Sequence, residues 1–380
     1  MMISHWGSSA AEVMSGAANV AALGVPTDGS VDVTAGLQEA WTNHGLIYLP
    51  PGTYKTSATL IGPATDGAGI VGEGSASTTI ICSDLTHDVI QSPDRISGLI
   101  FKGLKITRTA QATTGFGLNM NPISTNDWAF VNDLWLLNHA VGINLGSTGY
   151  SVAQKIRSEG NRFHGFQLVG QWQLLDLFAA LNGGNGFHVV STTPASSGQW
   201  RGLSTFENGG FGLLVFATSS ADRIEGLRIS DSFFGGDGAG EIFLDTFGNA
   251  LHTFTNVYCE LQPADVAGIV VTQNNPDCLF SGCHAEGSGG GGCALYYDGT
   301  GTLVVQGGSY ITSGNATAIS GTRGSASIMG AIARSATGTG IAMVAPMVAA
   351  AIIGCNASSI INTTATPYTQ GNYGSASGEA

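Results

Sequence analysis

Apolar and polar residues alternate along most of this chain in short runs that suit β-strands, and glycine-rich turns separate the runs. One turn pattern recurs about every two dozen residues: a small residue, usually glycine, is followed by an apolar residue that opens a strand. A repeat of this length cannot bury its own apolar face, so neighbouring repeats must stack on one another. The pattern therefore predicts a β-solenoid, and its copies begin at Gly117, Gly142, Gly165, Gly186, Gly212, Gly240, Gly268, Gly292, Thr317 and Gly340.

The segment at residues 24–60 differs from these repeats. Asp32 is placed to cap a helix from Thr34 to Trp41, and a strand and a forced turn at residues 50–53 follow it. We expect this helix to cover the open end of the solenoid, because bare strand edges there would invite aggregation.

These patterns divide the chain into four parts and place it in the all-β class. We expect a lead-in segment at residues 1–23 and an N-terminal cap, made of the helix and the first strand, at 24–62. A right-handed parallel β-helix of about 11 to 13 coils follows at 63–365, and a disordered tail ends the chain at 366–380.

Composition fits this fold and excludes several functions. Charged residues make up only 10% of the chain and 57 of its 380 residues are glycine, which suits stacked strands joined by tight turns. The formal net charge of −13 argues against a nucleic-acid partner. The longest apolar stretch, residues 341–354, contains Pro346 and is too short to cross a bilayer, so we expect no membrane insertion. The cysteines lack metal-ligand spacing, and we expect no metal and no cofactor.

Acidic residues recur near the ends of the strands that precede the turn pattern. With Cys259 and Cys283 inward, period-two alternation places Glu260 and Glu286 on the outer face. Adjacent coils are about 4.8 Å apart, which is close to the roughly 5–5.5 Å between the two carboxyls of a retaining glycosidase. Carboxyls that are two coils apart approach the roughly 6.5–9.5 Å separation found in inverting glycosidases. We therefore predict a catalytic acid column, although an ordinary solvated face would produce the same column. Its members are Glu207, Asp231, Glu260 and Glu286.

Aromatic and imidazole side chains near this column are candidates for binding sugar rings, because aromatic faces pack against apolar surfaces. Alternation places Tyr258 and His284 on the outer face, and we expect Tyr310 to join them from the next coil. Trp172 and Trp200 have glutamine and arginine neighbours, which favours partial exposure. All five are predicted to bind substrate.

A second cluster of side chains is basic. Arg157 adjoins Glu159, and Lys155, Arg162 and His164 are close in sequence. A polysaccharide lyase needs a base and a cation that neutralises a uronate carboxylate, and this cluster is the part of the sequence that suits such chemistry. We count Arg157 and Glu159 among the predicted substrate-binding residues; a solvated basic strand is the alternative.

The segment around the predicted helix resembles a known family. GVPTDGSVDVTAGLQEA, followed by GLIYLPPGTY, is similar to the N-terminal cap of right-handed β-helices of the pectate-lyase superfamily. Residues 48–54 match the turn into the first coil fully, whereas the acidic runs before the helix are degraded to Thr27-Asp28-Gly29 and Asp32-Val33-Thr34. The resemblance implies the fold but says little about activity, because this superfamily includes lyases, glycoside hydrolases, epimerases and phage tailspikes.

Together with the missing secretory signal and the low charge, the chain most resembles a phage tailspike or polysaccharide depolymerase. This implies a homotrimer at the virion tail, assembled in the host cytoplasm, or otherwise a secreted enzyme whose signal lies outside this sequence. We expect it to bind a bacterial surface polysaccharide (capsule, O-antigen or exopolysaccharide) and to hydrolyse glycosidic bonds through the acid column. A lyase that acts by β-elimination and a non-catalytic carbohydrate-binding spike are the alternatives.

Overall fold

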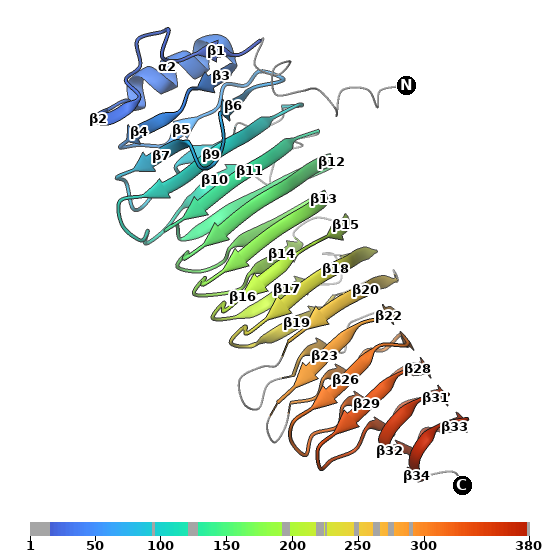
Figure 1. Cartoon of the computed structure of the whole chain (residues 1–380). Helices are drawn as coiled ribbons and strands as arrows, with labels where there is room; N and C mark the ends of the chain where they lie inside the picture. Colours follow the sequence, from blue (N-terminus) through green and yellow to red (C-terminus); the bar gives the residue numbers. More distant parts are fainter. Residues whose placement is uncertain are drawn as a thin grey trace. The chain divides into compact units, whose positions relative to one another are not determined.

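The chain folds into a parallel β-solenoid of about 12 turns with one short helix, which confirms the predicted right-handed β-helix class (Figure 1). The computed structural model describes residues 16–92, 96–120, 128–191, 198–217, 224, 226–246, 251–260, 267–272, 277–288 and 292–377, without the side chains of residues 147–150, 190–191 and 373–377. Among these residues, no helix is long and apolar enough to cross a membrane.

Two compact units divide the chain at residue 162. Unit 1 contains helix α2 (Thr34–His44) and strands β1 (Ala18–Asn19), β2 (Asp28–Asp32), β3 (Leu46–Leu49), β4 (Gly52–Thr56), β5 (Leu60–Ile61), β6 (Gly69–Gly72), β7 (Thr78–Cys82), β8 (Ile90–Gln91), β9 (Ile100–Arg108), β10 (Phe116–Met120), β11 (Phe130–Leu137) and β12 (Val141–Glu159). Unit 2 contains β13 (Phe166–Ala180), β14 (Phe187–Ser191), β15 (Gly198–Arg201), β16 (Ser204–Phe206), β17 (Phe211–Ala217), β18 (Leu227–Gly235), β19 (Gly240–Asp245), β20 (His252–Cys259), β21 (Ile269–Val271), β22 (Cys278–Ser281), β23 (His284–Gly287), β24 (Leu295–Tyr297), β25 (Thr302–Gln306), β26 (Ser309–Thr312), β27 (Ile319–Gly321), β28 (Ser325–Met329), β29 (Ile332–Ser335), β30 (Ile341–Met343), β31 (Ala349–Ile353), β32 (Asn356–Asn362), β33 (Thr366–Gln370) and β34 (Tyr373–Ser377).

Helix α2 extends beyond its predicted end at Trp41 and stops before Gly45, whose φ of 71° leaves the helical region. Its N-cap residue is Val33, so the predicted capping role of Asp32 is wrong by one position. Asp32 instead accepts hydrogen bonds from the backbone N–H and the hydroxyl of Thr34, at 2.8 and 2.6 Å. Its carboxylate therefore closes a turn before the helix begins.

Apolar and polar contacts fix the helix to strands of unit 1. Trp41 is fully buried and meets the ring of Phe101 edge-to-face, with the centroids 6.2 Å apart. The amide of Gln38 donates to the carbonyl of Ile61 and accepts from its backbone N–H, both at 2.8 Å. These contacts give β5 a partner on its open side, as a helix that covers the first coil requires.

One residue with a left-handed backbone interrupts the extended chain in coil after coil. These corner residues have φ between +50° and +68°, and the register pairs on either side place them opposite one another. For residues other than glycine this conformation costs roughly 1–2 kcal/mol of conformational energy, and asparagine and aspartate tolerate it best. The corner residues are Gly103, Asp133 and Lys155 in unit 1, and Asp176, Gly202, Asp231, Asn256, Gly282, Gly307, Gly330, Gly354 and Gly371 in unit 2.

Each corner residue fixes which side chains face outward in the strand after it. Following the corner at Asn256, Val257 and Cys259 are buried, whereas Tyr258 and Glu260 are exposed. The second and fourth positions after a corner therefore point outward, and the first and third point into the core.

The end of the chain corrects one expectation. Residues 366–377, which were expected to be disordered, form β33 and β34, and these strands pair with β31 and β32. The repeat pattern fades after about residue 363, which suggested disorder, but the corner at Gly371 continues the repeat, and backbone hydrogen bonds need no apolar side chain. At the other end, residues 1–15 of the expected lead-in lie outside the described residues.

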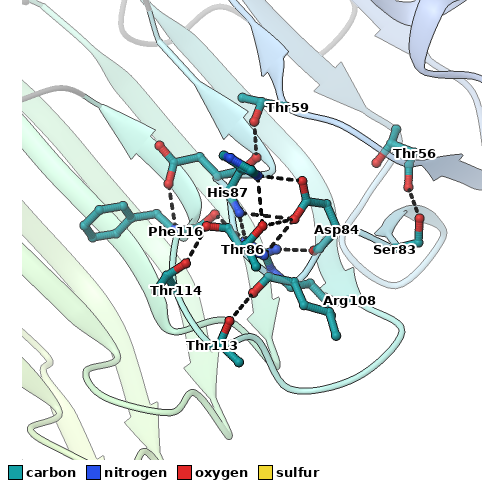
Figure 2. A network of polar contacts seen from close by, with 12 residues as sticks. Thr56, Thr59, Ser83, Asp84, Thr86, His87, Arg108, Thr113, Thr114 and Phe116 are labelled. Atoms are coloured by element: carbon teal, nitrogen blue, oxygen red, sulfur yellow. Dashed lines mark hydrogen bonds and ion pairs between the residues drawn. The ribbon is translucent and has the colours of Figure 1, made fainter.

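A buried arginine ties the loop after β7 to the rest of unit 1 (Figure 2). Arg108 is 2% exposed, and its guanidinium donates to the backbone carbonyls of Asp84 and His87. Its Nε also donates to Nδ1 of His139 at 3.0 Å. Burial lowers the pKa of His139 to about 3, so the imidazole remains a neutral acceptor. Two threonines at residues 113 and 114 donate to carbonyls of the same loop, so the loop is fixed from two sides.

Replacement of a corner glycine should destabilise the fold through the backbone alone. A Cβ added at Gly330 meets no atom within 4 Å, so Gly330→Ala tests its φ of +65° without a steric clash. We expect the free energy of unfolding to fall by about 1–2 kcal/mol in Gly330→Ala and by less in Gly330→Asn. Urea denaturation followed by circular dichroism measures both changes. Equal stability of the three proteins would contradict the role of the corner.

Candidate functional site

Two outward rows of side chains cross β16, β18, β20 and β23 of unit 2. In the first row, Phe233 is opposite Tyr258, and Tyr258 is opposite His284. In the second row, Phe206 is opposite Gly235, and the two glutamates follow the paired residues at positions 259 and 285. We call these side chains the acid face; it consists of Phe206, Phe233, Tyr258, Glu260, His284 and Glu286.

The rings of the first row stack along the coils. The centroids of Phe233 and Tyr258 are 5.6 Å apart with planes at 10°, and those of Tyr258 and His284 are 4.5 Å apart with planes at 18°. Tyr258 therefore presents its hydroxyl and ring edge to the outside, because its neighbours cover both ring faces. Desolvation, followed by the charges of Glu286 and Glu260, raises the pKa of Tyr258, so the hydroxyl keeps its proton.

The two glutamates occupy the same position in adjacent coils, each four residues after its corner. Glu260 is exposed, and the side chain of Glu286 is 24% exposed, with Oε1 3.1 Å from Nε2 of His284. Neighbouring strands are about 4.8 Å apart, so the carboxyls can approach the roughly 5–5.5 Å of a retaining glycosidase pair. The structure thus places both side chains on the outer face, as alternation predicted.

Phe206 is an open aromatic side chain in the same outward row as these carboxyls, two coils before Glu260, and it escaped prediction from the sequence. It is 44% exposed, and the residues in register on either side are Ala180 and Gly235. A Cβ at Gly235 would lie 2.7 Å from the ring of Phe233 and 3.0 Å from Oε2 of Glu260, so a larger residue there would displace these side chains. The available signal was a large apolar residue at an outward position between two coils that carry small ones.

The other two predicted acids occupy left-handed positions of the backbone. Asp231 has φ of 50°; its carboxylate lies 3.1 Å from Nε of Arg201 and accepts from the amide of Asn256 at 3.3 Å. Glu207 has φ of 51° and belongs to a second left-handed column that continues at Gly236. Backbone geometry accounts for both positions, and neither residue belongs to the acid face.

Three predicted sugar-binding aromatics are buried, so their predicted exposure is wrong. Trp172 and Trp200 are each 3% exposed, and Tyr310 is fully buried. The polar neighbours of the tryptophans are uninformative, because adjacent residues of a strand point to opposite faces. Tyr310 is the third residue after the corner Gly307, an inward position, and it lies opposite Ala285.

The predicted basic cluster lies mainly in unit 1. Arg157 is exposed, and its guanidinium is 2.6 Å from Oε1 of Glu159, which is 8% exposed. The indole of Trp135 donates to Oε2 of the same carboxylate at 3.1 Å. The structure therefore brings Arg157 and Glu159 together, whereas His164 belongs to unit 2, where its ring centroid lies 4.3 Å from that of His188.

Two fully buried carboxyls in unit 2 also escaped prediction. Oδ1 of Asp237 accepts from the backbone N–H and the amide of Asn208, at 2.8 and 2.7 Å, and Oδ2 accepts from the hydroxyl of Thr205. Glu241 accepts from the backbone N–H of Asp237 at 3.4 Å. Burial, followed by the hydrogen bond to Asp237 and its charge, raises the pKa of Glu241 to about 10. Glu241 therefore holds its proton at neutral pH.

The sequence did contain a signal for this pair. In register, Glu241 lies between Gly212 and Gly268, at a position of the turn pattern that otherwise carries a small residue. A charged residue at this position has to place its carboxyl in the interior of the coil, and Glu241 is fully buried. The charge of Glu260 contributes to the raised pKa of Glu241, which links the buried pair to the acid face.

The described residues contain no group of three or more His, Cys, Asp or Glu side chains that could hold a metal ion. The six cysteines are free, and Cys293 alone among them is not buried. Burial raises the pKa of Cys283 to about 11, so this thiol is neutral and packs as a core residue.

The start of the chain is similar to one known protein family. Residues 17–111 match the family described as rhamnogalacturonase A/epimerase, pectate lyase-like. This match, with the fold, confirms the resemblance to pectate-lyase-like β-helices that residues 48–54 indicated. A comparison of the sequence with curated proteins found no match.

Solved structures with the same fold include proteins of different kinds. The A-module of mannuronan C-5 epimerase AlgE4 from Azotobacter vinelandii is 16% identical, with a TM-score of 0.55, and the match covers 95% of this chain and 100% of that one. The N-terminal fragment of gene product 12 of bacteriophage phi29 is 11% identical, with a TM-score of 0.57, over 95% of this chain and 70% of that one. At these identities the likeness shows the fold alone.

Glu241→Gln should change how stability depends on pH. The pKa of Glu241 rises from about 4.5 to about 10 on folding, so the folded state keeps a proton and stability declines as the pH rises between these values. We expect the melting temperature to fall between about pH 5 and about pH 9, and to fall less in Glu241→Gln, which cannot ionise. Thermal denaturation followed by circular dichroism measures this difference. Glu39→Gln, on the exposed side of α2, serves as the control; a Glu241→Gln curve parallel to the wild-type curve would disprove the assignment.

Proposed function

We propose that the protein binds a bacterial surface polysaccharide along the acid face and hydrolyses its glycosidic bonds with Glu260 and Glu286. The observation that carries this proposal is the placement of two outward carboxyls at equal positions in adjacent coils. Phe206, two coils before Glu260 in the same outward row, offers an aromatic face on which a sugar ring can pack. The spacing of neighbouring strands suits the retaining mechanism.

The hydrogen bond of Glu286 suggests how the two roles divide. With the proton on Nε2, His284 donates to Glu286 and stabilises its ionised form, which suits a nucleophile that attacks the anomeric carbon. Glu260 then protonates the leaving oxygen and afterwards removes a proton from the water that releases the product. The hydroxyl of Tyr258 lies in the same row as His284 and can donate to a substrate oxygen.

The same proposal includes the setting of the protein. A bacteriophage gene product shares the fold, and we propose that this protein too belongs to a phage, as a homotrimer at the virion tail that acts on capsule, O-antigen or exopolysaccharide. A secreted enzyme with the same acid face is the alternative setting.

A second candidate is β-elimination, and the Tyr258–His284 stack favours it. A lyase needs a base that removes a proton beside a carboxylate and an acid that protonates the leaving oxygen, and an imidazole and a phenol in contact supply both groups. The relative named mannuronan C-5 epimerase gives some support to chemistry on uronates. A spike that binds sugar without cleaving it would use the same face.

Incubation with a panel of capsular and exopolysaccharides separates these possibilities. New reducing ends without ultraviolet absorbance from an unsaturated uronate support hydrolysis, and both signals together support elimination. Binding without either signal supports a non-catalytic spike and rejects the proposed hydrolysis for that polymer.

Substitution of the two glutamates should remove cleavage while the fold is retained. We expect Glu260→Gln and Glu286→Gln each to lower kcat by about 100-fold or more, because each removes a proton-transfer or nucleophilic group. Reducing-end assays measure the rate, and Glu73→Gln in unit 1 is the matched control. Cleavage at the wild-type rate in both variants would exclude this pair.

Phe206→Ala should weaken substrate binding more than it slows the chemical step. Loss of one aromatic contact of about 0.5–1.5 kcal/mol raises KM by roughly two- to tenfold with kcat nearly unchanged. Phe216→Ala, which removes a 38% exposed ring from β17, is the control. An unchanged KM in Phe206→Ala would show that no sugar packs on this ring.

A further inference from the structure

Cations gather on one outward region of unit 1 although the chain as a whole is acidic. The chain has 13 lysines and arginines against 26 aspartates and glutamates, yet three of its four lysines lie on β9 and β12. These are Lys102, Lys105 and Lys155, and none of them forms an ion pair with a described residue. Arg157 lies on β12, so the four cations share a region of three adjacent strands, β9, β11 and β12.

A tryptophan holds two of these cations in place. Lys105, Trp135 and Arg157 are opposite one another on β9, β11 and β12, each two residues after its corner. Nζ of Lys105 lies 4.0 Å from the centre of the Trp135 ring, and Cζ of Arg157 lies 5.4 Å from it. Because the two cations approach from neighbouring strands on opposite sides, the indole fixes the distance between them.

The nearby carboxylates are engaged by other groups. Glu159 is nearly buried between the guanidinium of Arg157 and the indole of Trp135. Asp133 accepts from the hydroxyl and the backbone N–H of Ser75, at 2.6 and 3.1 Å. Glu159 balances the charge of Arg157, and Asp133 carries one negative charge against the three lysines, so this region of unit 1 keeps a net positive charge.

We propose that this region, which we call the lysine face (Lys102, Lys105, Lys155 and Arg157), binds carboxylate or sulfate groups carried by the sugars of a polysaccharide. The inference rests on the proposed function and names its substrate class as an anionic glycan. Cations that are already positioned by Trp135 lose less conformational freedom on binding than free lysines do.

The net charge decides between an anionic glycan and a nucleic acid. Fields are screened over about 8 Å at physiological salt, so a polymer with one charge per sugar or fewer responds mainly to the local lysines. A nucleic acid carries about one charge per 1.7 Å of duplex and meets the whole surface, whose formal charge is −13. The lysine face therefore favours the sparsely charged polymer.

Affinity electrophoresis of the full chain through gels that contain dextran, polygalacturonate, or dextran sulfate with no more than one sulfate per sugar tests this site. We expect dextran sulfate and polygalacturonate, but not dextran, to retard the wild-type chain, and added salt to weaken the retardation. The combined variant Lys102→Gln, Lys105→Gln and Lys155→Gln should bind about tenfold more weakly, since three ionic contacts to the polymer are lost. Lys55→Gln on β4 is the matched control, and circular dichroism confirms that each variant is folded.

The lysine face would be overturned by the absence of retardation in both anionic gels, by equal retardation in dextran, or by unchanged binding of the combined variant. A single-stranded oligonucleotide is tested in the same way, and tighter binding of it than of either polymer would also overturn the lysine face. Cleavage is measured separately with Glu260→Gln. If the wild type binds anionic polymer through the lysines but cleaves no substrate, the lysine face stands and the proposed hydrolysis fails. If it cleaves only neutral polymers, hydrolysis stands and the lysine face fails.

Discussion

A left-handed residue at each corner is the constraint on which the rest of this structure depends. Because side chains alternate along a strand, the position of one corner decides the facing of every residue up to the next turn. Corners at Asn256 and Gly282 lie opposite each other in register, so Glu260 and Glu286 come to the same outward position. The acid face is thus a consequence of backbone geometry repeated from coil to coil, and the cores of the coils stack for the same reason.

The repeat, the helix and the parallel β-helix were predictable because they follow from glycine spacing and alternation, which are local properties of the sequence. Whether an individual residue points outward or inward was less predictable, because alternation has to be counted from the corner residue and not from the turn pattern. Counted from the turn pattern, Tyr310 appeared to face outward; counted from the corner Gly307, it faces the core. Corners at Asp231 and Lys155 are hard to recognise in a sequence, because no glycine marks them.

Side chains that pair across coils were beyond the reach of the sequence. The openness of Phe206 depends on small residues at 180 and 235, which are 26 and 29 positions away, and the stack of Tyr258 depends on rings from two other strands. Buried charge was equally hidden: Glu241 became informative only when register placed it in a column of small residues. In each case the missing information was the register between coils, which fixes partners that no local pattern contains.

Cross-linking tests the central claim, which is that the corner residues determine which side chains point outward and so bring Glu260 and Glu286 to equal positions one coil apart. Adjacent parallel strands are about 4.8 Å apart, within the roughly 4.4–6.8 Å between Cα atoms that a disulfide spans. The account predicts that the double variant Glu260→Cys and Glu286→Cys forms an intramolecular disulfide under mild oxidation, whereas Asp231→Cys with Glu286→Cys does not. Efficient cross-linking of the second pair, with none in the first, would show that the register and the acid face are wrong.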